Sequence, residues 1–268
     1  MKRHVVTLSG LALATALLSG CASNGSSSIM GSGTDVTASD VSRFTRTGFL
    51  SDYARLKPTS WGDGIECWRD TRLEAKQYDK VMISRILMSF KPKAGEEASI
   101  DPSDLKTLTD YFHQSLVNAL KPQMAIVTAP EPGTIVIRIA LTSLIPTNVS
   151  RSVTGTLIPY GFVAEAGSGT ATGRPAGSTP YMGETGIEIQ FLDAASGSIL
   201  GECRDTQIGR KYAAETDSGT AGAAQTWASG YVNSFQSWSY AKNAFDKWSL
   251  LIAQRFAELR GVTPAQEK

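Results

Sequence analysis

Residues 185–208, TGIEIQFLDAASGSILGECRDTQI, contain the pattern that decides the fold. Apolar and polar residues alternate in the first half, which places Ile187, Ile189 and Phe191 on one face of a strand. The central DAASG is rich in turn-forming residues, and the second half predicts a returning strand. The stretch therefore predicts an antiparallel β-hairpin with one apolar face.

Two amphipathic helices are expected to supply the layer that packs on this face. The first begins at Asp101, a candidate N-cap followed by Pro102, and ends before Pro122. The second carries one continuous apolar stripe and ends at Gly261. The positions of that stripe are Trp238, Ala241, Phe245, Trp248, Ile252, Phe256 and Leu259.

The remaining apolar runs are interpreted as strands. Residues 78–90 are apolar on both faces and predict one long central strand. Residues 126–144 predict a hairpin around 130–133, with isoleucines alternating along its second arm. The order of elements predicts an α+β fold, a two-layer sandwich of a mostly antiparallel sheet with two long helices packed on one face.

The N-terminus has the features of a secretory signal. Lys2 and Arg3 precede an apolar run too short to span a bilayer, and the run ends in Leu18-Ser-Gly-Cys21. This ending resembles the bacterial lipoprotein signal, in which the cysteine is acylated, with palmitate among the chains. By that resemblance Cys21 is the lipid-attachment site. Ala22 in place of Asp implies the periplasmic face of the outer membrane.

These features divide the chain into segments. Residues 1–20 are interpreted as signal peptide, 21–46 as the acylated cysteine and a flexible tether, and 47–262 as a single α+β domain. A long Gly-rich loop is expected at 148–183 and a C-terminal tail at 263–268. Lysine and arginine nearly balance aspartate and glutamate, 26 against 25, so nucleic acid is not an expected partner.

Two cysteines remain once Cys21 is assigned to the anchor. Cys67 and Cys203 predict a disulfide in an oxidising periplasm, with two isolated buried thiols as the alternative. A metal site is not expected, because His113 is the one histidine left after the signal and no CxxC or HxxxH spacing exists. No cofactor is expected.

Several segments together resemble a known family. They are Gly48-Phe-Leu-Ser-Asp-Tyr, Leu56-Lys-Pro58, Tyr78-Asp-Lys-Val81, Tyr181-Met-Gly-Glu184, Glu188, Asp193 to Leu200, Asp205 to Gly209 and Trp248. This set is similar to a family of bacterial lipoproteins catalogued as domain of unknown function 3313, from about residue 47 to 260. The resemblance implies a fold and a location, and it assigns no catalytic or binding residue.

The sequence offers few combinations of residues that could form a catalytic site. His113 is the sole candidate base for a serine hydrolase, and no Gly-x-Ser-x-Gly motif is present. Glu184 and Glu188 fall on the face opposite Ile187, which predicts a solvated sheet face or a partner surface. We therefore expect a protein that is not an enzyme.

The Gly-rich loop contains an apolar island that is awkward to leave in water. Its residues, with a nearby tyrosine, are candidates for a partner or ligand surface: Leu157, Ile158, Tyr160, Phe162, Val163 and Tyr181. The alternative is a loop folded against its own domain. The leading hypothesis is a non-catalytic, outer-membrane-anchored periplasmic lipoprotein that contacts envelope proteins in assembly or transport. The alternatives are a lipid or small-ligand binding module and, third, an envelope hydrolase.

Overall fold

The computed structural model describes residues 36–89, 100–148, 171, 178, 182–210 and 236–262. The chain divides into two units, residues 1–30 and 31–268, and all described residues belong to the second. Two groups of predicted functional residues lie outside the described ranges. They are Cys21, the predicted lipid-attachment site, and the predicted loop residues Leu157, Ile158, Tyr160, Phe162, Val163 and Tyr181.

The predicted hairpin is confirmed as strands β8 (Glu184–Asp193) and β9 (Ile199–Gly209), which pair in antiparallel register. The side chains of Ile187 and Ile189 are buried in the main apolar core. Asp193 closes the turn, because its carboxylate accepts hydrogen bonds from the backbone N–H and the hydroxyl of Ser196. The alternating pattern therefore determines the centre of the sheet.

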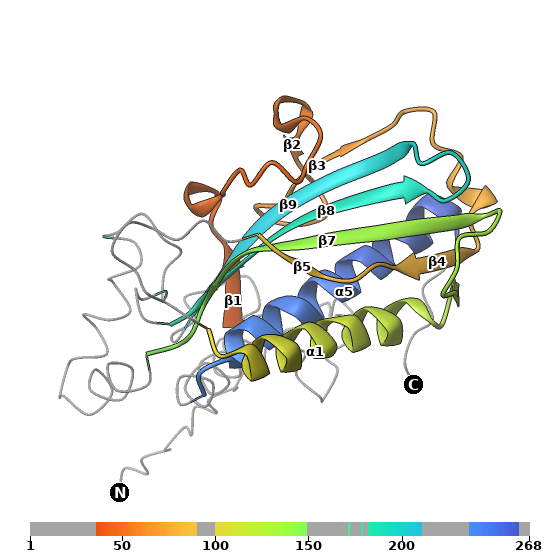
Figure 1. The fold of residues 1–268 in the computed structure, drawn as a ribbon. Helices are drawn as coiled ribbons and strands as arrows, with labels where there is room; N and C mark the ends of the chain where they lie inside the picture. The colour runs from red at the N-terminus through yellow and green to blue at the C-terminus, as the bar shows by residue number, and fades with distance from the viewer. Residues whose placement is uncertain are drawn as a thin grey trace, which may run out of the picture. The chain divides into compact units, whose positions relative to one another are not determined.

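Seven further strands complete the sheet. They are β1 (Thr37–Ser39), β2 (Lys57–Pro58), β3 (Glu66–Arg69), β4 (Lys80–Ile83), β5 (Leu87–Met88), β6 (Ala125–Ile126) and β7 (Thr134–Ile145). The strand order is β2-β3-β9-β8-β7-β4-β6, with β1 also paired to β9 and β5 to β7 (Figure 1). Pairing is antiparallel from β2 to β7 along this order, whereas β4, β5 and β6 pair in parallel, so the sheet is mixed.

The prediction of one long strand over 78–90 is wrong, because the segment is broken into β4 and β5. Both halves pair with β7, Ile83 opposite Ile137 and Leu87 opposite Ala140. Four steps along one strand thus correspond to three along the other, and the extra residue interrupts the ladder as a bulge does. The segment also lies towards one end of the sheet, with only β6 beyond β4.

The hairpin predicted over 126–144 is also wrong, although its second arm is a strand. β4 lies between β6 and β7, and Lys80 has Ala125 on one side and Thr134 on the other. Both pairings are parallel, which a tight turn cannot make. Val81 of β4 is fully buried, so the insertion of this strand adds an apolar side chain to the core. The two-residue strand β6 contributes no fully buried side chain.

The two predicted helices are confirmed as α1 (Pro102–Leu120) and α5 (Ser239–Arg260). The carboxylate of Asp101 accepts a hydrogen bond from the backbone N–H of Ser103 at 2.7 Å, which caps α1. Gly261 ends α5 in the left-handed conformation with φ 68°, which favours glycine because it has no Cβ.

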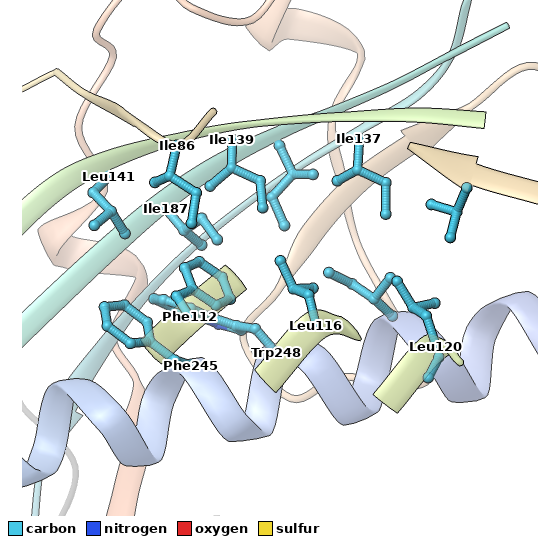
Figure 2. Packing of buried hydrophobic residues seen from close by; sticks show 14 of the residues in the cluster. Ile86, Phe112, Leu116, Leu120, Ile137, Ile139, Leu141, Ile187, Phe245 and Trp248 are labelled. Atoms are coloured by element: carbon cyan, nitrogen blue, oxygen red, sulfur yellow. The ribbon is translucent and has the colours of Figure 1, made fainter. Parts of the chain in front are cut away.

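The apolar faces of both helices and of the sheet form one core (Figure 2). Phe112 of α1 stacks on Phe245 of α5 with ring centroids 4.4 Å apart, and Trp248 lies beside both rings. Ile137 and Ile139 of β7 point into the same cluster and are fully buried. The fold is therefore a mixed α/β one, in which an open nine-stranded sheet carries two helices.

The predicted tether over 21–46 is wrong in its C-terminal part, where the folded body already begins. Thr37–Ser39 pairs with β9, and the backbone N–H of Asp40 donates to the carbonyl of Thr206. Val36 is buried against Met182 and Tyr240. The segment has few apolar residues, but the free edge of β9 beyond β3 supplies the backbone partners that order it.

Among the residues that the structure describes, no helix combines the length and the apolar character needed to cross a membrane.

Candidate functional site

The face of the sheet turned away from the helices carries a row of carboxylates. Glu184 and Glu188 of β8 and Glu202 of β9, named here the acidic row, alternate with side chains of the core. Glu184 and Glu188 lie on the face of the sheet away from the Ile187 side chain, as the alternation predicts. Of the two expectations for Glu184 and Glu188, a solvated sheet face or a partner surface, the solvated face is wrong, because both side chains are buried. Glu202 beside them is buried completely. Residues 40–56, named here the strap, cover them; in Figure 1 this segment lies above β8 and β9, and the helices lie below.

Two of these carboxylates are tied to the strap by hydroxyl groups and a guanidinium. Glu188 accepts hydrogen bonds from the Thr47 hydroxyl at 2.6 Å and from the Tyr53 hydroxyl at 2.9 Å. Glu184 accepts from Nε of Arg43 at 2.7 Å and from the hydroxyl of Ser143 on β7. Each carboxylate therefore accepts hydrogen bonds from two side chains, and these bonds fix the strap to the sheet.

Glu202 has the densest set of donors in the row. It accepts hydrogen bonds from the backbone N–H and hydroxyl of Ser51, from the Arg55 guanidinium at 2.6 Å and from the Gln190 amide. Burial alone would raise the pKa of Glu202, but these donors outweigh it and lower the pKa. Arg55 also stacks over the ring of Trp68, 3.5 Å from the ring centroid.

The acidic row thus braces the strap against the sheet. Every carboxylate in it is buried and accepts hydrogen bonds from at least two side chains. Each buried carboxylate has hydrogen-bond partners, which offsets the cost of removing it from water. Glu184 and Glu202 also pair with Arg43 and Arg55.

The predicted disulfide is confirmed. Cys67 of β3 is bonded to Cys203 of β9, its opposite residue in the antiparallel register. Cys203 also lies opposite Ile189 of the core, so the bridge is on the face of the sheet that carries the helices. The two cysteines are 136 residues apart in sequence. A link of this span removes a large loop-closure entropy from the unfolded chain in the entropic model.

The helices are too few to cover this face completely. Seven strand positions span about 30 Å at about 4.8 Å per strand, whereas two helices packed 8–10 Å apart cover roughly 20 Å. The helix α1 contacts β6 at one end of the sheet, and α5 contacts β8 and β9. The apolar face of β3 and the outer part of β9 is therefore left beyond the flank of α5.

A cavity of about 220 Å³ occupies this position, between α5 and strands β3, β8 and β9. Its walls are apolar, and the disulfide is part of its lining. The apolar side chains include Ile189, Phe191 and Leu200 from the sheet and Leu251, Ile252 and Phe256 from α5. Exposed Lys57, Pro58 and Arg69 are also in the lining, so the cavity opens to solvent beside β2 and β3.

One carboxylate lines this cavity. Asp205 is 2% exposed, and burial raises its pKa. One of its oxygens accepts from the backbone N–H of Thr206, and the other accepts from the Trp248 indole N–H at 2.7 Å and from the Gln207 amide. The ring of Trp248 is thereby fixed between the cavity and the core.

His113, the sole candidate base for a hydrolase, is exposed on α1 next to buried Phe112. Within the described residues it donates or accepts no hydrogen bond, and it lies in the lining of a separate surface hollow between α1 and β5. In the same part of the chain, no three His, Cys, Asp or Glu side chains are placed to hold a metal ion.

The family whose model is described as Protein of unknown function (DUF3313) matches residues 45–232. The chain belongs to this family. The match includes most of the strap, the disulfide and the strands β2 to β9, and it ends before α5. Two of the DUF3313 motifs of the sequence meet in space, since Tyr53 donates a hydrogen bond to Glu188.

Solved structures similar to this DUF3313 chain at low identity include the three described here, and no curated protein matches it. Two are PelC dodecamers from Paraburkholderia phytofirmans. The first, a variant, has 14% identity and a TM-score of 0.30, and the match covers 64% of this chain and 95% of that chain. The second has 11% identity and a TM-score of 0.29, with 64% and 98% covered.

The third is protein XCC0632 from Xanthomonas campestris, of the family DUF330. It has 11% identity and a TM-score of 0.28, and the match covers 70% of this chain and 93% of that chain. At these identities and TM-scores the similarities support no inference about function.

Sequence reasoning missed two features of this DUF3313 protein, the covering of the acidic row and the cavity beside α5. A signal for the first was present, because the motif containing Ser51 and Tyr53 belongs to the same resemblance as Glu188. No comparable signal existed for the cavity, because its walls come from strands and a helix distant in sequence.

Proposed function

We propose that this protein is a lipid-anchored envelope protein without catalytic activity, and that it binds an apolar ligand in the cavity beside α5. The observation that carries the proposal is the cavity itself. Its volume of about 220 Å³ exceeds the roughly 150 Å³ of an engineered cavity that takes up benzene, and it is below the roughly 300 Å³ at which drug-sized pockets begin. One alkyl chain or one ring suits such a space.

The chemistry of the walls supports the same reading. Each methylene moved from water into an apolar cavity contributes about 0.8 kcal/mol. Asp205, the one carboxylate in the lining, is 2% exposed and already accepts three hydrogen bonds from the protein, including the one that holds Trp248. Binding is therefore favoured over acid–base catalysis at this position.

The location forms part of the proposal and rests on the N-terminal sequence. Acylation at Cys21 and export to the periplasmic face of the outer membrane follow from the lipoprotein-like signal. We also propose that the folded body is a two-layer sandwich, with α1 and α5 packed on one face of the sheet. This arrangement would leave the cavity open along the flank of α5.

Photo-labelling of the full-length protein in isolated membranes tests ligand binding. The probe is a long-chain alcohol carrying a diazirine on its alkyl chain, and the readout is the labelled peptide identified by mass spectrometry. We expect label in peptides containing residues 61–69 and 248–259, because both ranges line the cavity.

A pair of substitutions on α5 provides the control. Leu251→Trp fills the cavity and should abolish the labelling, whereas Leu250→Trp places the same side chain on the exposed flank, where Leu250 is 39% exposed. Labelling that is equal in both variants, or absent from the wild type, would show that the cavity does not take the ligand.

A second candidate function is contact with another envelope protein in assembly or transport. The apolar island at 157–163, flanked by glycines, is the sequence observation that favours it. Crosslinking in intact cells from a photoreactive residue at Phe162 should then give one discrete adduct, and the same residue placed at exposed His113 should give none. The absence of any crosslinked adduct from the photoreactive residue at Phe162 would count against this candidate.

A further inference from the structure

The entrance of the cavity carries two cations on one face. Lys57 of β2 lies opposite Cys67 of β3, and Arg69 is two residues further along β3. Residues in this diagonal relation lie about 7–8 Å apart on the same face of a sheet. Both line the cavity and both are exposed. The two side chains therefore form a cationic rim beside the apolar space.

The part of the chain that the structure describes does not compensate these two charges. Within the described residues, no carboxylate lies within ion-pair distance of Lys57 or Arg69, whereas neighbouring Arg55, Arg72 and Arg204 each have one. Like charges in cross-strand positions repel each other. An anion placed between the two groups relieves that repulsion. The rim is therefore complementary in charge to an anionic ligand.

The other two cations of the lining are already engaged. Arg204 of β9 pairs with Glu66 of β3. Arg255 of α5 pairs with Glu258 and lies over the ring of Trp61, 5.7 Å from the ring centroid. The lining contains one acid, Asp205, which is buried and accepts its hydrogen bonds from Trp248 and two other donors. The available charge at the entrance is thus positive.

We infer that the ligand is an amphiphile with a single alkyl chain and an anionic head group, the chain lying in the cavity and the head group between Lys57 and Arg69. This inference rests on the proposed ligand-binding function and adds the identity of the ligand class. The volume of about 220 Å³ leaves no room for the two chains of a phospholipid. A fatty acid is the simplest member of the class.

Competition against the alkyl-diazirine alcohol probe measures the head-group preference. The competitors are dodecanoate, dodecanol and dodecyltrimethylammonium, each added to membranes containing the full-length protein. We expect dodecanoate to compete about fivefold better than dodecanol at low salt, and the ammonium compound to compete least, because two cations near the head group attract the first and repel the last.

The matched variants are Lys57→Gln with Arg69→Gln for the rim and Lys121→Gln as an exposed cation at the end of α1, away from the cavity. The rim double variant should lose the preference for dodecanoate, and the Lys121 variant should keep it. Raising the salt from about 0.05 M to about 0.5 M should weaken the preference in the wild type, because exposed charges are screened. The membrane contributes equally to all variants.

Chain length gives an independent measurement. Each added methylene should strengthen competition by about fourfold until the cavity is full, after which the gain stops. Equal competition by all three head groups in the wild type, with the probe still bound, would overturn the anionic head group and leave ligand binding intact. Failure of the probe to label the wild type would overturn both.

Discussion

The two faces of the sheet are closed by different means. The face towards the helices is closed by apolar packing, with Phe112 and Phe245 stacked at its centre. The opposite face is closed by the strap, whose hydroxyls and guanidinium groups bind Glu184, Glu188 and Glu202. Apolar packing tolerates an unfilled space such as the cavity, whereas a buried carboxylate needs every partner in place.

The largest expected effect is on the helix side. Phe112→Ala removes a fully buried ring from the stack with Phe245 and should cost about 3–5 kcal/mol of unfolding free energy, through lost burial and a cavity. Urea denaturation followed by circular dichroism measures the change. His113→Ala, on the adjacent exposed position, should stay within about 0.5 kcal/mol. Similar losses for both would mean that the helix face is not the stabilising one.

The second effect concerns the edge of the helix side, where packing is incomplete and the disulfide holds β3 to β9. Replacing Cys67 and Cys203 by alanine should cost about 2–4 kcal/mol, because the unfolded chain regains the entropy of a long loop. Thermal unfolding of the double variant measures it. The wild type measured in the presence of a thiol reductant should have the same unfolding temperature as the double variant. A wild type that is insensitive to reductant would contradict the role of the bridge.

The third effect tests the strap side. Glu202→Ala leaves Arg55 and Ser51 without their carboxylate and should lower the free energy of unfolding by about 2 kcal/mol. The loss is smaller than for an unpaired charge that is fully buried, because Arg55 is partly exposed to water. Limited proteolysis should then cut the strap faster than in the wild type. Asp70→Ala, which removes the partner of the exposed Arg72 side chain, is the control and should leave the strap protected.

The smallest effect is a difference in pH dependence between the two faces. The pKa of Glu202 is lowered in the folded state, so its stabilisation is present at neutral pH and is lost as the pH falls below the usual glutamate value of about 4.3. Burial raises the pKa of Asp205 on the helix side, so its contribution has the opposite sign and is lost as the pH rises.

Unfolding free energies of Glu202→Gln and Asp205→Asn, measured from pH 3 to pH 8, distinguish the two groups. The Glu202 variant should show a shallower loss of stability in acid than the wild type. The Asp205 variant should lose less stability than the wild type as the pH rises towards neutrality. Parallel pH profiles for the two variants would show that the faces do not differ electrostatically.

Local patterns predicted the helices and the central hairpin because their signals are contained within one element. Asp101 caps α1, Gly261 ends α5, and Ile187 alternates with polar neighbours in β8. The strand at 78–90 and the hairpin at 126–144 were predicted wrongly for a shared reason. An apolar run indicates that a strand is buried, but it does not indicate which strand pairs with it. The insertion of β4 between β6 and β7 therefore cannot be predicted from the local sequence.

The sequence by itself determined which residues are apolar and where the helices begin and end, and it predicted the bridge between Cys67 and Cys203 without placing the two residues side by side. The tertiary structure alone decided that the strap covers the acidic row and that α5 stops short of β3. The physical reason is geometric. Two helices are narrower than seven strands, and only the packed sheet shows which strands they leave uncovered.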